Sequence, residues 1–340
     1  IVLKTKRPHL VTEQIKNHKI LQETDGVYKL AIRWDLHEAQ VLASLKVKDI
    51  RSPIDRDYGW TGKYTPFDHQ KETSNFLTLH KKAFCFNEQG TGKTASVIWA
   101  ADYLINMGQV NRVLVICPLS IMKSAWQQDL FKFAMHRSCS VAHGTSTQRK
   151  KILDAGAEFV IINYDGVAVV MDEIMKGGFD MVVIDEANAY KNAQTNRWKT
   201  LKAIVEDVPW LWMLTGTPAA QSPVDAFGLA KLINPDGVPK YFGQFRDKVM
   251  YKVTQFTWRP KSDSDKTVHE ALQPAIRFEK DQCLGVLPVT YVERNAPLTK
   301  QQETYYKLLK DQMVMEADGE QVTSVNAATN LNKLLQISGG

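Results

Sequence analysis

The stretch "KAFCFNEQGTGKTASVIWAADYLI", residues 82–105, decides the fold of this chain. "KAFCF" is a short apolar run typical of a buried strand, "NEQGTGKT" is a turn of small and polar residues, and "ASVIWAADYLI" has the apolar spacing of a helix. A strand, a turn ending in Gly-Lys-Thr and a helix form the context that a phosphate-binding loop requires. Asn87 occupies the position that usually opens this motif with glycine, and asparagine tolerates unusual backbone angles.

Four further apolar runs follow the same scheme, each followed by a turn signal and a helix-like stretch. They are "RVLVICP" (112–118), "EFVIINY" (158–164), "FDMVVIDE" (179–186) and "LWMLTGTP" (211–218). Apolar runs without alternation are typical of strands buried on both faces, and helical spacers predict right-handed crossovers. The sequence therefore predicts an α/β fold with a parallel sheet and flanking helices, whose special residues lie at the carboxyl ends of the strands.

The composition is that of an ordinary globular protein. The 340 residues are 44% hydrophobic and 24% charged, and this length indicates about two domains. The formal charge of +6 is compatible with a polyanionic partner. The four cysteines form no CxxC pair, so we expect reduced thiols. No apolar run approaches the ~18 residues of a membrane span, so we expect an intracellular protein without a membrane partner.

The patterning changes along the chain and predicts four parts. Residues 1–60 form a small α+β accessory unit, with a strand at 27–34 and a helix at 36–45. Residues 61–237 form a lobe that holds the parallel sheet and the candidate phosphate-binding loop.

The two remaining parts follow the sheet. Residues 238–298 form a helical insertion with an exposed polar loop at 259–267 and an extended crossing strand at 287–298. Residues 299–340 form a helical extension that we expect to be the incomplete start of a second lobe, with an amphipathic helix over 299–317.

The glycine loop offers a chemical role for each of its residues. The candidates for binding the nucleotide are Gln89, Gly90, Thr91, Gly92, Lys93 and Thr94. The two glycines let backbone amides curl around phosphate oxygens because they lack a Cβ. Lys93 places a charge on those phosphates, Thr94 offers a hydroxyl to Mg²⁺, and the next helix directs its positive dipole end at the anion.

An acidic pair follows a separate apolar strand in "MVVIDEANAYKN", residues 181–192. Asp185 can hold Mg²⁺ through water opposite Thr94, and Glu186 can position or deprotonate the attacking water. With Lys93 in the right order, the pair predicts ATP hydrolysis, with Glu186, Lys93 and Asp185 as catalytic candidates and with ATP and Mg²⁺ as cofactors.

The order of these motifs resembles that of the Snf2 family of superfamily 2 helicases and translocases. "DEAN" (185–188) is similar to the family's Asp-Glu-Ala-His box. Four more stretches are similar to segments of the family, namely "YTPFDHQ" (64–70), "VLVICPLSIMKSAWQQDL" (113–130), "MLTGTPAAQSPVDAFGLAKLINP" (213–235) and "LPVTYVERNAPLTKQQETYYKLL" (287–309). The resemblance runs from about residue 64 to the end, and implies a RecA-like P-loop NTPase lobe of a motor that moves on double-stranded or branched DNA.

The resemblance also implies roles for residues outside the loop. Gln70 would read the adenine base, with Phe67 beside it. The Thr-Gly-Thr segment would bind beside the nucleotide and couple the state of the γ-phosphate to lobe closure. It consists of Thr215, Gly216 and Thr217. Residues at strand ends that can offer amides and hydroxyls to a nucleic-acid backbone are Pro118, Ser120, Asn163 and Tyr164.

Three departures from the family pattern modify these expectations. Asn87 stands where the family commonly has Asp, and Asn188 stands where it usually has His. Asn188 can still bridge to the Thr-Gly-Thr segment, but it cannot titrate near neutral pH. The family's second lobe supplies arginines that reach the γ-phosphate, whereas Arg277 and Arg294 precede that lobe. We therefore expect ATP binding with weak hydrolysis, and a second motor lobe beyond residue 340 as a partner.

Two other interpretations stay open. A strand-separating or branch-migrating superfamily 2 helicase fits the loop and the acidic box equally well, and a nucleic-acid-binding module with a vestigial nucleotide site is a further alternative. A metabolic P-loop kinase would leave "LTGTP" unexplained. We expect a monomer in the cytoplasm of a bacterial or virus-infected cell, or in the nucleus if the host is a eukaryote.

Overall fold

The computed structural model describes residues 1–219, 221–283, 296–319 and 324–339. The chain divides into two compact units, Ile1–Val286 and Leu287–Gly340. No described helix is both long enough and apolar enough to span a bilayer.

The first unit is built on a seven-stranded sheet with the strand order β12-β4-β9-β8-β5-β7-β6. Every neighbouring pair in this sheet is parallel. In chain order the strands are β4 (Lys82–Cys85), β5 (Val113–Cys117), β6 (Cys139–Ala142), β7 (Phe159–Asn163), β8 (Met181–Asp185), β9 (Trp210–Leu214) and β12 (Ala275–Ile276). The predicted parallel α/β fold is confirmed, and all five expected strands are present.

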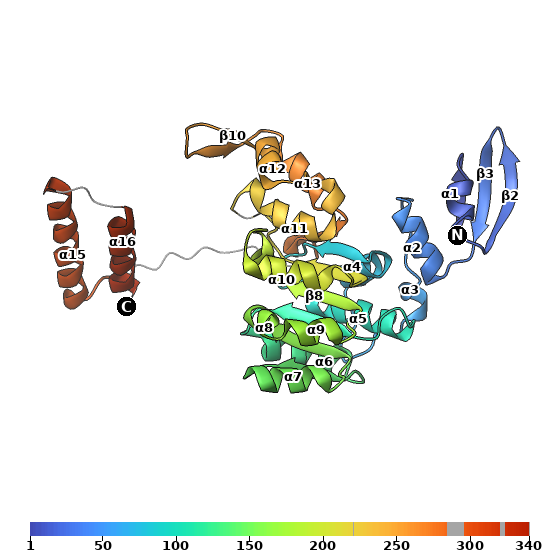
Figure 1. Ribbon diagram of the computed structural model, residues 1–340, viewed down its shortest axis with the longest axis horizontal. Coiled ribbons are helices and arrows are strands. Elements are labelled where there is room, and N and C mark those ends of the chain that lie inside the picture. Colours follow the sequence, from blue (N-terminus) through green and yellow to red (C-terminus); the bar gives the residue numbers. More distant parts are fainter. Residues whose placement is uncertain (220, 284–295, 320–323, 340) are drawn as a thin grey trace. The chain divides into compact units, whose positions relative to one another are not determined.

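Helices cover both faces of this sheet (Figure 1). One face packs against α4 (Asp68–Leu79), α5 (Lys93–Asn106), the π-helical turn η1 (Met122–Gln127) and α6 (Gln128–Phe133). The other packs against α7 (Ser146–Asp154), α8 (Tyr164–Val169), α9 (Met171–Lys176), α10 (Asn196–Val205) and α11 (Ala226–Ile233). Successive side chains of β5 enter opposite cores, because side chains alternate across a strand. Val113 and Val115 pack in the core on one face of the sheet, and Leu114 and Ile116 pack in the core on the other face.

Two strands of the sheet are not anticipated by the sequence pattern. The edge strand β6 is only partly buried, so it lacks the apolar run of its neighbours. The opposite edge strand β12 has two residues and pairs with β4 at the register Ala275–Phe84. A strand this short gives no periodicity signal.

The N-terminal residues form a separate antiparallel sheet with the order β1-β3-β2. Its elements are β1 (Val2–Thr5), α1 (His9–Thr12), β2 (His18–Thr24) and β3 (Val27–Ile32), and α2 (Leu36–Ser44) and α3 (Ile54–Asp57) follow. Asp25 and Gly26 both have positive φ, 52° and 71°, as a tight hairpin turn requires. The expected strand at 27–34 and helix at 36–45 are confirmed, apart from their last residues.

The region between the sheet and residue 283 differs from the expected set of helices with an exposed loop. It contains α12 (Phe242–Val249), an antiparallel hairpin of β10 (Met250–Lys252) and β11 (Trp258–Pro260), α13 (Ser264–Ala271), β12 and α14 (Lys280–Cys283). The polar run 259–267 is mostly exposed, as expected, but its second half lies in α13. Short 3₁₀ turns elsewhere are η2 (Ala187–Tyr190), η3 (Pro223–Asp225) and η4 (Pro235–Gly237).

The described residues of the second unit include the helices α15 (Lys300–Gly319) and α16 (Ser324–Gly339). The predicted helix at 299–317 is therefore confirmed. Its first turn is capped because the Thr299 hydroxyl accepts from the Gln302 N–H, while the Gln302 side chain accepts from the Thr299 N–H. The expected strand at 287–298 lies almost entirely outside the described residues.

Candidate functional site

The strand order brings three sequence motifs together at one edge of the sheet. β4 leads into the glycine loop, β9 into the segment 215–217, and β8 into the acidic pair Asp185 and Glu186. β9 pairs with both β4 and β8, and neighbouring strands lie about 4.8 Å apart. Because all three strands run parallel, their carboxyl ends open on the same edge.

The glycine loop has a backbone conformation that other residues do not easily adopt. Gly90 and Gly92 have φ values of +85° and +79°, in the region that favours glycine. A Cβ on Gly92 would lie 2.1 Å from the side-chain nitrogen of Gln70, so a larger residue there would have to displace the Gln70 side chain. Lys93 begins α5, and its ammonium donates to the backbone oxygens of Asn87 (2.7 Å) and Glu88 (3.1 Å). The loop is thus a cradle that suits phosphate oxygens.

The two threonines of the loop have different surroundings. Thr91 is buried, and its hydroxyl donates to the Glu88 oxygen at 2.7 Å. Thr94 lies half-buried in the first turn of α5. The described residues contain no group of three or more His, Cys, Asp or Glu side chains that could hold a metal ion. A Mg²⁺ ion held by few protein oxygens and by substrate phosphates needs no such group, and a hydroxyl such as that of Thr94 and a carboxylate such as that of Asp185 are oxygen ligands of the kind it takes.

The acidic pair lies where β8 enters η2. Asp185 is buried, and its carboxylate accepts hydrogen bonds from the Trp126 indole N–H (2.9 Å) and the Glu186 N–H (3.0 Å). Burial raises the pKa of Asp185, and the Trp126 hydrogen bond and the positive charge of Lys93 act in the opposite direction. The positive charge of Lys93 thus favours the ionised form of the Asp185 carboxyl group.

Glu186 occupies a strained position at the same corner. Its backbone has φ 51° and ψ 57°, a left-handed conformation that is costly for a residue with a side chain and is often found at functional sites. Its carboxylate lies 3.4 Å from the side-chain nitrogen of Gln89. The acidic pair and the glycine loop are therefore in direct contact.

The Thr-Gly-Thr segment lies between the other two motifs. The Thr215 N–H donates to the Cys85 oxygen at 3.1 Å, and a Cβ on Gly216 would lie 3.7 Å from the Gln89 nitrogen. Asn188 donates to the backbone oxygen (2.8 Å) and the hydroxyl (3.3 Å) of Thr217. The bridge expected between Asn188 and this segment is present.

Aromatic side chains line a cavity of about 410 Å³ beside the loop. Phe67 stacks on His69 with their ring centroids 5.7 Å apart, and the Phe278 ring lies 5.9 Å from His69. Gln70 accepts from the Phe67 N–H and donates to the Thr91 oxygen, so its amide joins this cavity to the loop. Flat walls of this kind suit a nucleobase.

Asn87 connects the glycine loop to a segment that lies 191 residues further along the chain. Its side-chain oxygen accepts from the Phe278 N–H at 3.0 Å, and its side-chain nitrogen donates to the Thr73 hydroxyl at 2.8 Å. Asn87 is 1% exposed, so both contacts are shielded from water. His69, Phe278 and this role of Asn87 were missed by the sequence interpretation. The irregular pattern of 238–286 gives no signal for Phe278, and nothing in the motifs that contain His69 and Asn87 indicates that this segment reaches them.

The residues assigned to nucleic-acid binding follow β5 and β7, which pair with each other. Pro118 is half-buried and Ser120 is exposed. Asn163 is buried and accepts from Arg149 at 3.0 Å. The Tyr164 hydroxyl donates to the backbone oxygens of Asp185 and Glu186. The polar groups of Asn163 and Tyr164 are thus engaged inside the protein, whereas Ser120 is open to solvent.

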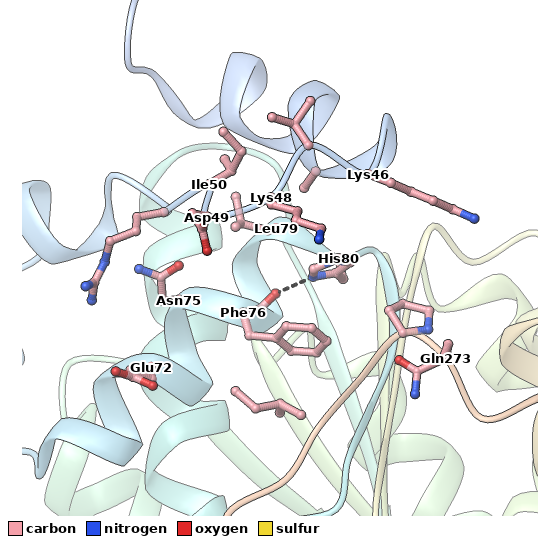
Figure 2. A pocket seen from close by; sticks show the side chains of 15 residues that line it. Lys46, Lys48, Asp49, Ile50, Glu72, Asn75, Phe76, Leu79, His80 and Gln273 are labelled. Atoms are coloured by element: carbon pink, nitrogen blue, oxygen red, sulfur yellow. Dashed lines mark hydrogen bonds between the residues drawn. The ribbon is translucent and has the colours of Figure 1, made fainter. Parts of the chain in front are cut away.

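A larger cavity, about 610 Å³, lies beside the C-terminal half of α4 (Figure 2). Its lining includes Lys48 and Asp49 from the loop after α2, and Phe76 and His80 from the end of α4. His80 bonds to the Phe76 oxygen at 2.8 Å, and burial lowers the pKa of His80. None of the sequence motifs lines this cavity, so the motifs, rather than the cavity volume, locate the candidate nucleotide site.

Comparison with known proteins agrees with this arrangement. A family model described as "SNF2-related domain" matches residues 69–338. The chain is 27% identical over 300 residues to the chromodomain-helicase-DNA-binding protein 1-like of Mus musculus. This alignment covers 84% of this chain and 32% of the relative. It is 23% identical over 288 residues to the ISWI chromatin-remodeling complex ATPase ISW1 of Saccharomyces cerevisiae, covering 81% of this chain and 25% of the relative.

A solved structure shares the fold. The Sulfolobus solfataricus SWI2/SNF2 ATPase core in complex with dsDNA aligns with a TM-score of 0.56 and 23% identity, over 82% of this chain and 59% of that chain. By length, the chain corresponds to a third or less of the mouse and yeast relatives named above. The family match extends over most of the sequence and includes the glycine loop, the acidic box and the Thr-Gly-Thr segment, and the chain belongs to the family of SNF2-related domains.

Proposed function

We propose that this chain is the ATP-binding first lobe of a motor that couples ATP hydrolysis to movement on double-stranded DNA. The observation that carries the proposal is the convergence of the glycine loop, the acidic pair and the Thr-Gly-Thr segment at the ends of β4, β8 and β9. DNA as the partner is supported by a similar ATPase core that was solved in complex with dsDNA.

Each motif has a part in the proposed reaction. Lys93 and the amides of the glycine loop hold the phosphates, and Phe67, His69 and Gln70 form the base end of the site. Glu186 positions or deprotonates the attacking water. Thr94 and Asp185 hold Mg²⁺, which neutralises charge on the phosphate oxygens when it is bound. In this family, Thr215 and Thr217 would report the state of the γ-phosphate to a second lobe.

Hydrolysis by this chain is proposed to be slow. Within the described ranges, no arginine forms a hydrogen bond to the glycine loop, and an arginine that reaches the γ-phosphate contributes ~10³-fold or more to the rate. A second lobe that supplies such arginines is the proposed partner. Exposed apolar side chains that such a lobe could cover are Tyr305, Leu308, Leu331 and Leu335.

Steady-state ATPase and equilibrium ATP binding, each with and without duplex DNA, test the proposal. We expect ATP to bind, with slow turnover that duplex DNA increases little. Lys93→Ala should abolish binding, and Lys199→Ala, which changes an exposed lysine of α10, should not. Robust DNA-stimulated turnover would overturn the assignment of slow hydrolysis, whereas a wild-type chain that fails to bind ATP would overturn the nucleotide site itself.

Two further assays separate the alternatives. Strand displacement by the protein joined to its second lobe would favour a strand-separating or branch-migrating helicase. DNA binding that is identical in the wild type and Lys93→Ala, with no ATP binding by either, would favour a nucleic-acid module with a vestigial site. We expect a monomer that acts in the cytoplasm of a bacterial or virus-infected cell, or in the nucleus of a eukaryote.

A further inference from the structure

The segment from Pro274 to Lys280, which includes β12, lies along the edge of β4 opposite β9 and continues to the glycine loop. Backbone N–H groups of Phe84, Phe86 and Glu88 donate to the oxygens of Pro274 (2.9 Å), Ile276 (2.8 Å) and Phe278 (3.0 Å). Every second residue of the loop strand is therefore bonded to this segment, as in a parallel ladder. The ladder extends past the end of β4 into the loop itself.

Two side chains of the loop fix the end of this segment. Asn87 accepts from the Phe278 N–H, and the Glu88 carboxylate accepts from the Lys280 N–H, both at 3.0 Å. Consecutive loop residues thus bond to alternate backbone groups of the segment. The Cα of Lys280 is held against the glycine loop by contacts that do not involve its own side chain.

The Lys280 side chain extends over the loop. Its Cε and Nζ lie 3.7 and 3.9 Å from the point where a Cβ on Gly90 would stand. Lys280 is exposed and, among residues 1–219 and 221–283, forms no ion pair within 4.0 Å. Lys93 approaches the same loop through the oxygens of Asn87 and Glu88. Two ammonium groups, 187 positions apart in the sequence, therefore meet at one short glycine turn.

We propose that Lys280 is a second phosphate-binding lysine, which increases the affinity of the site for longer polyphosphates. The inference rests on the proposed nucleotide site. A glycine with positive φ exposes its backbone to an anion. An ammonium beside it adds a point charge, and the attraction of this charge for a ligand grows with the negative charge of the ligand. Lys280 therefore selects ATP over ADP and ADP over AMP.

Equilibrium binding of fluorescent ATP, ADP and AMP with Mg²⁺ tests this proposal. Lys280→Ala should weaken ATP binding by about tenfold, ADP binding less and AMP binding not at all. Lys280→Arg should keep most of the wild-type preference, because the charge remains. The difference between wild type and Lys280→Ala should shrink as salt rises, since an exposed charge is screened.

Controls separate a charge effect from a folding effect and from failure of the nucleotide site. Lys199→Ala, an exposed lysine on α10, should bind all three nucleotides as the wild type does. Thermal unfolding without nucleotide should be equal for Lys280→Ala and wild type, while stabilisation by inorganic tripolyphosphate should be smaller in the variant.

Three outcomes decide the matter. Loss of the triphosphate preference in Lys280→Ala with an unchanged melting temperature supports the proposal. Equal ATP affinities for Lys280→Ala and wild type overturn the role of Lys280 and leave the nucleotide site intact. A wild-type chain that binds no nucleotide overturns both.

Discussion

The indole N–H of Trp126 donates a 2.9 Å hydrogen bond to the carboxylate of Asp185, 59 residues further along the chain. Trp126 lies in the π-helical turn η1 and is completely buried. π-Helical turns commonly occur at functional sites, where they redirect side chains. This turn orients one oxygen of the acid that would hold Mg²⁺, so the β5 segment helps to order the β8 segment.

Trp126→Phe is expected to weaken the response to Mg²⁺. The aromatic packing remains while the donor to Asp185 is lost, and losing a partner of a metal-binding group typically costs 10- to 100-fold in metal affinity. The measurement is the Mg²⁺ concentration that gives half-maximal ATP binding. Trp212→Phe is the matched control, because the Trp212 indole also donates one 2.9 Å bond, to the His80 oxygen. The assignment fails if both variants need the same Mg²⁺ concentration as the wild type.

Asn87→Ala is expected to destabilise the fold by roughly 2–4 kcal/mol, because the buried Phe278 N–H loses its acceptor and the Thr73 hydroxyl loses the donor Asn87. Asn87→Asp should cost less, since a carboxylate still accepts from the Phe278 N–H, while the Thr73 hydroxyl keeps its own hydrogen bond to the His69 oxygen. Urea denaturation of the three proteins measures the difference. An aspartate variant as unstable as the alanine variant would show that these hydrogen bonds do not hold the segment.

Asp102→Ala is expected to be strongly destabilising, by about 3–5 kcal/mol. Asp102 is completely buried in α5 and accepts from the Tyr58 hydroxyl (2.5 Å), His136 (2.9 Å) and Arg137 (2.5 Å). Its removal takes the charged acceptor away from the buried Tyr58 hydroxyl and from Arg137, whose side chain is 11% exposed. Asp165→Ala is a suitable control, because Asp165 also pairs with an arginine but is 82% exposed. Comparable losses in thermal unfolding for the two variants would contradict this view of Asp102.

Gly228→Ala and Gly243→Ala are expected to change stability in opposite directions. A Cβ on Gly228 would lie 2.1 Å from the Lys191 oxygen, so alanine must displace the backbone beside the acidic box at a cost of about 1–3 kcal/mol. Gly243 is in α12 and has open space around it, so alanine should stabilise the helix by up to ~1 kcal/mol. Denaturant midpoints check both signs, and a neutral Gly228→Ala would mean that α11 is free to move.

Thiol alkylation is expected to distinguish the cysteines by pH and by nucleotide. Burial raises the pKa of Cys85 to about 11 and that of Cys117 to about 12, so at pH 8 nearly all of both thiols stay protonated and unreactive. Their labelling rate should rise as pH increases toward those values. Cys283 is half-buried and lines the cavity beside the glycine loop that Phe67, His69 and Phe278 also line. It should therefore react first, and ATP should protect it.

Peptide mass spectrometry after timed iodoacetamide treatment gives each rate. Protection of Cys283 by ATP but not by an equal concentration of a nucleotide-free polyphosphate would place the base in this cavity. Equal labelling with and without ATP would mean that the base binds elsewhere.

Much of the sheet follows from local patterns. The runs at β4, β5, β7, β8 and β9 are apolar on both faces because helices cover both sides of the sheet. The edge strands β6 and β12 escaped prediction because burial is incomplete at β6 and because β12 has two residues. Local patterns predict strongly buried elements well and edges poorly.

The sequence by itself determined that a glycine turn, an acidic pair and a Thr-Gly-Thr segment each follow a buried strand, because strand burial and backbone freedom are encoded in neighbouring residues. Only the tertiary structure decided that Trp126 orients Asp185, that Tyr164 bonds to the acidic box and that Lys280 reaches the glycine loop. These contacts join residues from 21 to about 190 positions apart. Strand order and edge pairing bring such residues together, and neither leaves a periodic signal in the chain.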